Sequence, residues 1–351
     1  MSVQQNSVNF GKIGHCILFG GGSLLAHLVK KLKQEGFSVF VVTSDRHADE
    51  RIAVEAQSIS LMEFLKKNRV DFTVAGDIST DAGVISRITD QTIGISFGAA
   101  WIFKKEFIDL FKGRLLNCHG SRLPENRGGG GFSWRILRGD RAGASVLHRI
   151  DPGIDTGDIL FSEEYVFPDQ CRLPADYQAY SIERYRKFFD RFFASIKAER
   201  SFTATPQQER SSSYWPRLVT DIHGYIDWSW SLQNIERHIR AFDDPYAGAS
   251  TFVDGRKVRL KKVGLSSADG LFHPFQNGLI YRISENSVFV ATKEGTLVIK
   301  TVLDEGGLEI TDQLRVGERF HTPMQFLEEA KHFRAIYTPN GLKKENQAHA
   351  H

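Results

Sequence analysis

The chain has 351 residues, of which 41% are hydrophobic and 25% are charged, the proportions of a soluble globular protein with room for two domains. The formal net charge of +3 is too small to favour a nucleic-acid or membrane partner by itself. The three cysteines lack the spacing of a disulfide framework or a zinc site, so no metal is predicted. Because the sequence has neither a signal-peptide core nor an apolar run of bilayer length, we expect a cytoplasmic protein without a membrane partner.

The N-terminal part of the chain alternates between strand and helix patterns. Short apolar runs bounded by turn residues predict strands, and apolar residues at helical spacing predict the helices between them. Such alternation is typical of a Rossmann-like α/β domain with a mainly parallel sheet. The predicted strands are residues 13–19, 37–43, 72–75 and 92–97, and the predicted helices are residues 24–34, 60–67 and 83–88.

Candidate ligand contacts follow the first two predicted strands. Gly21, Gly22 and Ser23 link the first strand to a helix, an arrangement that places backbone N–H groups against a phosphate. The spacing is not GxGxxG, and a tight turn alone also explains the glycines. Arg46 comes just past the second strand, where side chains of a doubly wound sheet face the ligand crevice. A solvated loop residue is equally consistent with that position.

Apolar residues continue beyond the strand predicted at 92–97. Phe97, Trp101, Ile102 and Phe103 crowd a strand end where polar loop residues are usual. Core packing is the common explanation for such a run. The functional alternative is a wall for a flat, mostly apolar ring.

Residues 115–160 contain the candidate catalytic groups. Asn117 and His119 end a short apolar strand at positions i and i+2, so their side chains point to the same side of the strand. Asp155 lies in a later, turn-rich loop between two glycines, and four consecutive glycines at 128–131 allow the backbone to approach a ligand closely. Taken singly, each polar residue is explained by a turn, a surface position or a capped loop.

An amide, an imidazole and a carboxylate together suit acyl transfer to an amine. Asn117 can donate an N–H to the oxygen that becomes negative in a tetrahedral intermediate. His119 can exchange a proton near neutral pH, or stabilise the same oxygen as an imidazolium. Asp155 can fix the charge state of the histidine or relay the proton of the amine.

Three separated pieces of this segment resemble the signature of the folate-dependent formyltransferases. They are the sequence NCHGSRLP at 117–124, the glycine-rich loop and the sequence GIDTGD at 153–158. The resemblance implies that Asn117, His119 and Asp155 are catalytic and that 10-formyltetrahydrofolate is the cosubstrate. The four-glycine run departs from the usual loop of the family, which affects how the acceptor is held. Cofactor contact is expected for Phe97, Trp101, Ile102, Phe103 and Ile154, and acceptor contact for Gly21, Gly22, Ser23 and Arg46.

The pattern changes in the C-terminal part of the chain. A strand at 161–167 and a long helix at 176–196, whose apolar stripe is typical of a core, precede a polar linker at 197–213. Beyond it, short strands with hairpin turns predict a small barrel, and residues 226–251 resemble the OB-like C-terminal domain of methionyl-tRNA formyltransferases and related sugar enzymes. We therefore expect a catalytic domain at 1–205, a smaller β-rich OB-like barrel domain at 206–335 and a polar tail at 336–351.

Charge bears on the identity of the acceptor. A tRNA acceptor needs phosphate neutralisation by Lys and Arg. Residues 210–351, however, contain 18 Lys and Arg against 17 Asp and Glu, with one short basic cluster at 256–262. A nucleotide-linked amino sugar needs only a few donors for its diphosphate and a stacking face for its base. We therefore favour a sugar N-formyltransferase, with methionyl-tRNA formyltransferase as the alternative.

Two further interpretations come from other functional classes. A non-catalytic binder of folate or nucleotide is disfavoured because Asn117, His119 and Asp155 are all present. A hydrolase that removes the formyl group from the folate, with water in place of the amine, is disfavoured because the C-terminal barrel suits a large acceptor. The sequence leaves open whether the chain forms a homodimer.

Overall fold

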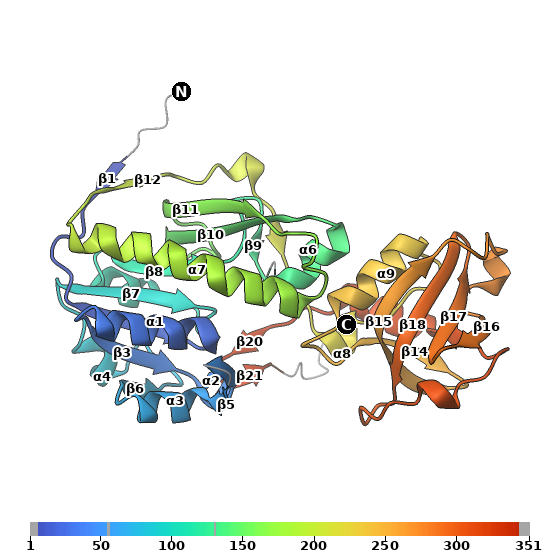
Figure 1. The fold of residues 1–351 in the computed structure, drawn as a ribbon. Coiled ribbons are helices and arrows are strands. Elements are labelled where there is room, and N and C mark those ends of the chain that lie inside the picture. Colours follow the sequence, from blue (N-terminus) through green and yellow to red (C-terminus); the bar gives the residue numbers. More distant parts are fainter. Residues whose placement is uncertain (1–5, 55–56, 130, 344–351) are drawn as a thin grey trace, which may run out of the picture.

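The computed structural model describes residues 6–54, 57–129 and 131–343. These residues form two lobes that lie side by side, each built on its own sheet (Figure 1). The first lobe contains a seven-stranded sheet with helices on its faces, and the second contains a six-stranded antiparallel sheet.

The seven-stranded sheet has the strand order β11-β10-β8-β7-β2-β3-β6. The five strands from β8 to β6 are parallel, and β10 and β11 extend the sheet beyond β8 as antiparallel strands. Central strands such as β7 are buried along their whole length, which explains why the sequence shows continuous apolar runs there. The predicted α/β fold with a mainly parallel sheet is confirmed. The strands are β2 (His15–Gly20), β3 (Ser38–Thr43), β6 (Asp71–Val74), β7 (Thr92–Phe97), β8 (Leu115–His119), β10 (Ala142–Arg149) and β11 (Ile159–Val166).

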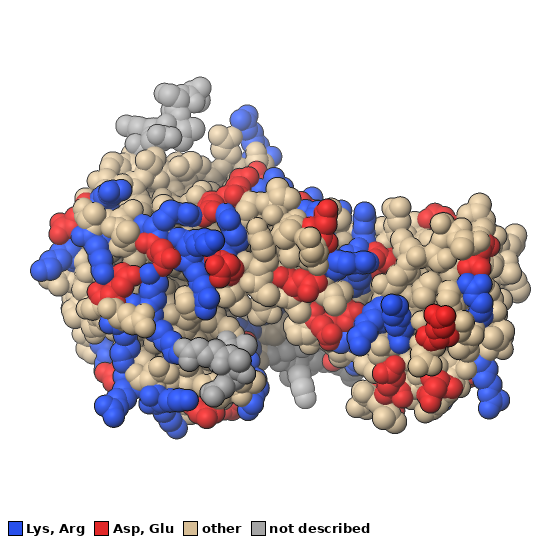
Figure 2. All heavy atoms as spheres, viewed as in Figure 1, with Lys and Arg blue, Asp and Glu red and all other residues tan. Residues whose placement is uncertain are grey.

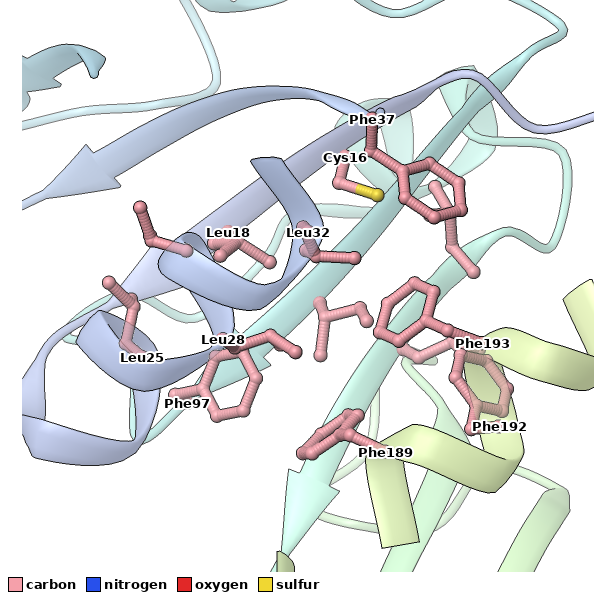
Figure 3. Packing of buried hydrophobic residues seen from close by; sticks show 14 of the residues in the cluster. Cys16, Leu18, Leu25, Leu28, Leu32, Phe37, Phe97, Phe189, Phe192 and Phe193 are labelled. Atoms are coloured by element: carbon pink, nitrogen blue, oxygen red, sulfur yellow. The ribbon is translucent and has the colours of Figure 1, made fainter. Parts of the chain in front are cut away.

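Helices cover both faces of this sheet. On one face, the leucines of α1 meet the phenylalanines of α7 in a single buried cluster (Figure 3), and α3 packs beside α1. On the other face, Phe107 and Phe111 from the α5 region pack edge-on against Phe19 of β2. The helices of this lobe are α1 (Gly22–Gln34), α2 (Asp45–Ala48), α3 (Leu61–Lys67), α4 (Ala82–Ile85), α5 (Lys105–Leu110), α6 (Phe132–Arg138) and α7 (Pro174–Lys197).

The second lobe is a strongly curved sheet with the order β16-β17-β18-β15-β14-β19. Its two edges meet, because Ile280 N–H donates to the Glu318 carbonyl (2.9 Å) and Phe320 N–H donates to the Gly278 carbonyl (2.9 Å). The sheet therefore curls into the small barrel that the sequence predicts. Its elements are α8 (Thr220–His223), α9 (Leu232–Ala241), β14 (Ala249–Val253), β15 (Arg256–Ser266), β16 (Ile280–Ser284), β17 (Ser287–Thr292), β18 (Gly295–Leu303), β19 (Phe320–His321) and α10 (Met324–His332), with short 3-10 turns at Pro274–Gln276 and Thr311–Gln313.

The polar segment at 197–213, interpreted from the sequence as a linker, packs along the first lobe. β12 (Phe202–Ala204) pairs with β1 (Asn6–Val8), and β13 (Tyr214–Trp215) pairs with β9 (Arg127–Gly128), with a 3-10 turn at Glu209–Ser211 between them. Phe202 and Ala204 of this segment are buried in the core of the lobe, and polar residues beside them bind the lobe through hydrogen bonds. We propose that the division near residue 205 separates the two sheets, with the following residues as a connection that remains bound to the first lobe.

The chain returns to the first lobe after α10. A short hairpin of β20 (Tyr337–Thr338) and β21 (Gly341–Leu342) lies beside α2 (Figure 1), within the segment expected to be a polar tail. Another small hairpin, β4 (Arg51–Val54) with β5 (Gln57–Ser60), precedes α3. Residues 344–351 of the predicted tail lie outside the described residues. Within the described part of the chain, no helix has the length and apolar character needed to cross a membrane.

The aromatic cluster on α7 yields a test of the core. We expect Phe192→Ala to lower the free energy of unfolding by about 3–5 kcal/mol, because the fully buried ring packs against Phe161, Phe193 and Phe202 and leaves a cavity when it is removed. Urea denaturation measures the change. The control Phe275→Ala removes a ring that is 80% exposed and should alter stability by less than about 0.5 kcal/mol. Equal effects of the two substitutions would contradict this assignment of the core.

Candidate active site

The sheet topology brings the candidate catalytic residues together at one end of β8. Asn117 and His119 lie in β8, and antiparallel pairing with β10 places His148 directly opposite Asn117. Asp155 lies in the loop between β10 and β11. Its backbone has a φ of +54°, a left-handed conformation that Asp adopts more readily than most residues, and this turns its side chain towards β8.

Asp155 is the centre of the hydrogen-bond network. The Asn117 amide nitrogen donates to Asp155 Oδ1 (3.1 Å) and to His148 Nε2 (3.1 Å). His119 Nδ1 lies 3.6 Å from Asp155 Oδ2. The structure thus brings Asn117, His119 and Asp155 into one group and adds His148 to it.

The glycine-rich loop and the connection after β12 hold Asp155 in place. The Gly128 backbone N–H donates to Asp155 Oδ2 (2.8 Å), and Gln207 Nε2 donates to the carbonyls of Asp155 and Gly157 (2.8 Å each). Gly128 has a φ of +84°, and a Cβ there would lie 2.4 Å from the Tyr214 ring. Glycine is therefore required at this position both for the backbone conformation and for the close approach of β13.

The surroundings of Asp155 favour its ionised form. Burial raises the pKa of its carboxyl group, but the neighbouring imidazoles of His148 and His119 and the backbone N–H of Gly128 outweigh burial and lower the pKa to about 2. Burial also lowers the pKa of His119, although the Asp155 charge opposes that shift. At neutral pH the site therefore contains an aspartate anion beside a neutral histidine.

Hydrogen-bond partners assign the positions of the histidine protons. His119 Nε2–H donates to the Asn126 carbonyl (2.7 Å), so the lone pair of Nδ1 faces Asp155. His148 Nδ1–H donates to the Arg149 carbonyl (2.8 Å), which leaves Nε2 to accept from Asn117. A proton that arrives at His119 Nδ1 would form an ion pair with Asp155, so this imidazole is arranged to accept one.

Two cavities flank this group of residues. The first cavity, of about 310 Å³, is lined by residues that include Asn117, Asp155 and His148. The second cavity, of about 290 Å³, lies on the side of the glycine-rich loop and is lined by residues that include Trp134. Both are bordered by His119 and Gly128, so the candidate catalytic group separates two spaces that are each large enough for part of a small molecule.

Four of the five predicted cofactor contacts line the first cavity, namely Trp101, Ile102, Phe103 and Ile154. Ile102 is 84% exposed and Ile154 is 56% exposed, so apolar side chains stand on both sides of an open cavity. Trp101 is buried, and its indole N–H donates to the Gly76 carbonyl (3.0 Å). These walls fit a flat ring of low polarity.

Phe97 is the predicted cofactor contact that does not line the first cavity. Its ring packs in the core, 5.7 Å from the ring of Phe189 on α7 and beside Leu28 of α1 (Figure 3). Because side chains alternate along a strand, the neighbouring Ser96 lines the first cavity in its place.

The predicted acceptor contacts lie together but outside the two cavity linings. Gly21 lies against His47, because a Cβ at Gly21 would be 2.8 Å from His47 Cβ. Gly22 and Ser23 begin α1 next to it. Arg46 Nη2 donates to the carbonyl of Gly98 (3.3 Å), a residue that lines the first cavity. The four residues thus form an edge next to the site.

Sequence reasoning missed several residues at the site. His148 interrupts the apolar run at 144–150, and a histidine inside a buried strand was the available signal for it. Arg135, on α6, is buried and donates to the Gly120 carbonyl and Ser121 Oγ (3.0 Å each), which fixes the turn after His119. Gln207 and Arg217 belong to the connection after residue 205, where no sequence pattern singles out either residue.

Comparison with known proteins shows the family. Residues 15–171 match the formyl transferase family, and residues 219–313 match the formyl transferase C-terminal domain. The chain belongs to the folate-dependent formyltransferase superfamily. It is an N-formyltransferase with 10-formyltetrahydrofolate as its cosubstrate, as the motifs around Asn117 and Asp155 predict.

Named relatives of this formyltransferase differ in their acceptors. Methionyl-tRNA formyltransferase of Dechloromonas aromatica (strain RCB) is 28% identical over 252 residues, covering 69% of this chain and 78% of that protein. The N-formyltransferase of Helicobacter canadensis, solved with folinic acid and dTDP-3-aminofucose, shares the fold at 19% identity and a TM-score of 0.61, covering 82% of this chain and 98% of that one. A sugar 3N-formyltransferase solved with dTDP and 5-N-formyl-THF gives 21% identity, a TM-score of 0.60 and coverages of 82% and 96%.

The ionised Asp155 makes the stability of this formyltransferase depend on pH in a way that can be tested. A carboxyl group whose pKa falls on folding stabilises the protein above its unfolded pKa and loses that effect as the pH falls through its folded pKa. We expect Asp155→Asn to lose about 2 kcal/mol of stability near pH 6 through this effect, and the difference from wild type to shrink between about pH 4 and pH 2. Urea unfolding at a series of pH values measures it, with the exposed Asp254→Asn as the control for loss of one charge. A difference that stays constant over that range would contradict the assignment.

Proposed function

We propose that this formyltransferase transfers the formyl group of 10-formyltetrahydrofolate to the amine of a nucleotide-linked amino sugar. Asn117, His119 and Asp155 are the catalytic residues in this proposal. The observation that carries it is that all three residues line the first cavity, which shares His119 and Gly128 with the second. The first cavity, with its apolar walls of Trp101, Ile102, Phe103 and Ile154, suits the pteridine of the donor, and the second suits the acceptor.

The hydrogen-bond network suggests a role for each group. The unprotonated acceptor amine attacks the formyl carbon, and the formyl oxygen becomes negative as the new C–N bond forms. Asn117 presents its amide N–H groups inside the site, and one of them changes its hydrogen-bond acceptor to this oxygen without giving up its proton. Because His119 Nε2–H is bound to the Asn126 carbonyl, we assign His119 to the proton rather than to the oxyanion.

Proton transfer completes the reaction. The nitrogen of the former amine releases its proton to His119 Nδ1, and the Asp155 anion stabilises the imidazolium that results. The proton then moves to N10 of the folate as the bond between N10 and the formyl carbon breaks. Atoms and charge balance, because the amine loses the proton that N10 gains.

The lining of the second cavity supports a nucleotide-linked acceptor. Trp134 and Tyr246 offer aromatic faces, and Arg217 offers a guanidinium group, which are the groups that bind a base and a phosphate. The Trp134 indole N–H donates to the Pro216 carbonyl (2.7 Å), which fixes the ring. The Helicobacter canadensis protein, of the same fold, was solved with a dTDP-linked amino sugar.

Charge in the second lobe gives little support to a tRNA acceptor. Lys261 in the basic cluster forms ion pairs with Asp243 and Asp244, and Arg259 pairs with Asp221 (2.8 Å). These pairs leave less free positive charge for phosphates. On the face seen in Figure 2, acidic and basic side chains alternate over this lobe, and they form no broad positive area. The sequence relatives keep methionyl-tRNA formyltransferase as the second candidate.

A product assay separates the two candidates. The enzyme is incubated with 10-formyltetrahydrofolate and either a panel of dTDP- and UDP-linked amino sugars or initiator methionyl-tRNA, and formylated products are identified by mass spectrometry. We expect formylation of at least one amino sugar and none of the tRNA. Formylation of the tRNA alone would refute the proposed acceptor.

The catalytic assignment predicts the effects of single substitutions. We expect Asn117→Ala to lower kcat by about 10²–10³-fold, because it removes a donor to the oxyanion, and Asp155→Ala to lower kcat strongly by leaving the imidazolium unpaired. The control Asn234→Ala, at an exposed position on α9, should keep the wild-type rate. Turnover near the wild-type rate in both site variants, measured with whichever acceptor is active, would rule out this mechanism.

A further inference from the structure

The segment that follows α10 returns to the first lobe. We call residues 336–343 the return hairpin. It is closed by Lys343 N–H, which donates to the Ile336 carbonyl (2.8 Å), and by Thr338 Oγ1, which donates to the Gly341 carbonyl (3.0 Å). The Arg46 backbone N–H reaches the Pro339 carbonyl (3.4 Å), so the hairpin lies against the segment that follows β3 (Figure 1).

Tyr337 of the return hairpin contacts two arginines from distant parts of the chain. The guanidinium carbon of Arg46 lies 5.1 Å from the centre of the Tyr337 ring, and that of Arg217 lies 4.4 Å from it. Arg46 follows β3 of the first lobe, whereas Arg217 belongs to the connection between the lobes. One aromatic ring therefore holds two positive charges close together through cation–π contacts.

Arg46 has donors without partners at this place. Its Nη2 donates to His47 Nε2 (2.8 Å) and to the Gly98 carbonyl (3.3 Å). Its Nε and Nη1 are buried and make no hydrogen bond with any described residue. Burial and the charge of Arg217 lower the pKa of Arg46, which shows that the surroundings disfavour the positive charge. Buried donors of this kind are costly to leave unsatisfied, and an anion would satisfy both the donors and the charge.

The carboxylate of Glu50, whose charge acts on Arg46, does not fill this role. Glu50 is bound to His47 Nδ1 (3.0 Å), on the far side of that imidazole from Arg46. The arginine pair also lies beside the two cavities. Arg217 lines the second cavity, and Gly98, which Arg46 contacts, lines the first. The pair thus spans the rim between the two cavities, close to Gly21.

We propose that the return hairpin completes the acceptor site, with Tyr337 as a positioning residue that holds Arg46 and Arg217 together as a clamp for the diphosphate of the acceptor. Two guanidinium groups suit a diphosphate because each can donate two hydrogen bonds to phosphate oxygens. This inference rests on the proposed function, since it names the phosphate subsite of the nucleotide-linked acceptor. It also gives the C-terminal end of the chain a role at an active site in the first lobe.

Kinetics of full-length variants test the clamp. We expect Tyr337→Ala to raise KM for the nucleotide-linked amino sugar about tenfold, while kcat and KM for 10-formyltetrahydrofolate change little. Tyr337→Phe keeps the ring and should restore the wild-type KM. The matched control is Ile336→Ala, which changes the adjacent residue of the same hairpin, whose side chain is half exposed. An unchanged acceptor KM in Tyr337→Ala, or equal effects of Tyr337→Ala and Tyr337→Phe, would overturn the proposal.

A binding experiment separates failure of the clamp from failure of the proposed function. Inorganic pyrophosphate is titrated calorimetrically into the wild type, Tyr337→Ala, Tyr337→Phe and Ile336→Ala at one fixed ionic strength. We expect the wild type, Tyr337→Phe and Ile336→Ala to bind alike and Tyr337→Ala to bind about tenfold more weakly. If this pattern appears while no amino sugar is formylated, the clamp stands and the acceptor proposal fails. Absence of pyrophosphate binding to the wild type, or equal binding by Tyr337→Ala, would refute the clamp even where an amino sugar is formylated.

Discussion

The candidate active site depends on keeping the Asp155 carboxylate ionised inside the protein. Burial alone would favour its neutral form, and the structure opposes this with a backbone N–H from Gly128, the amide of Asn117 and two imidazoles. The anion in turn fixes the other groups. It requires the Asn117 side chain to present its nitrogen rather than its oxygen, and it stabilises a proton on His119. Without this charge the remaining residues would be ordinary polar groups at a strand end.

The parts of the chain that hold this anion come from very different positions in the sequence. The glycine-rich loop supplies Gly128, β8 supplies Asn117 and His119, and the connection towards the barrel supplies Gln207. These hydrogen bonds attach the connection to the first lobe. They also explain how groups on the connection, such as Arg217, reach a cavity whose other walls belong to the first lobe.

Much of the fold and the centre of the site could be predicted from the sequence, for physical reasons that particular residues illustrate. Asn117 and His119 were predictable because a period of two places both side chains on one side of a strand. Asp155 was predictable only with the help of the family signature, because no local rule links residue 155 to residue 117. The direction of the Phe97 ring could not be predicted, because it faces the core on a strand buried on both faces, where hydrophobicity does not tell the two faces apart.

Other features depend on contacts that no local pattern encodes. The segment at 197–213 is polar enough for a free linker, yet it pairs with β1 through β12, and the two residues that follow it pair with β9. Tyr337 lies in a stretch with the composition of a tail, and its contacts with Arg46 and Arg217 join segments separated by most of the chain. Such tertiary contacts appear only when the lobes are assembled.

The most direct measurement of the central claim is a crystal structure of the enzyme with 5-formyltetrahydrofolate and a nucleotide-linked amino sugar. The account predicts the pteridine between Trp101 and Ile154, the sugar amine in the second cavity, and N10 facing that amine across Asn117, His119 and Asp155. A pteridine or an amine bound away from these three side chains would contradict it.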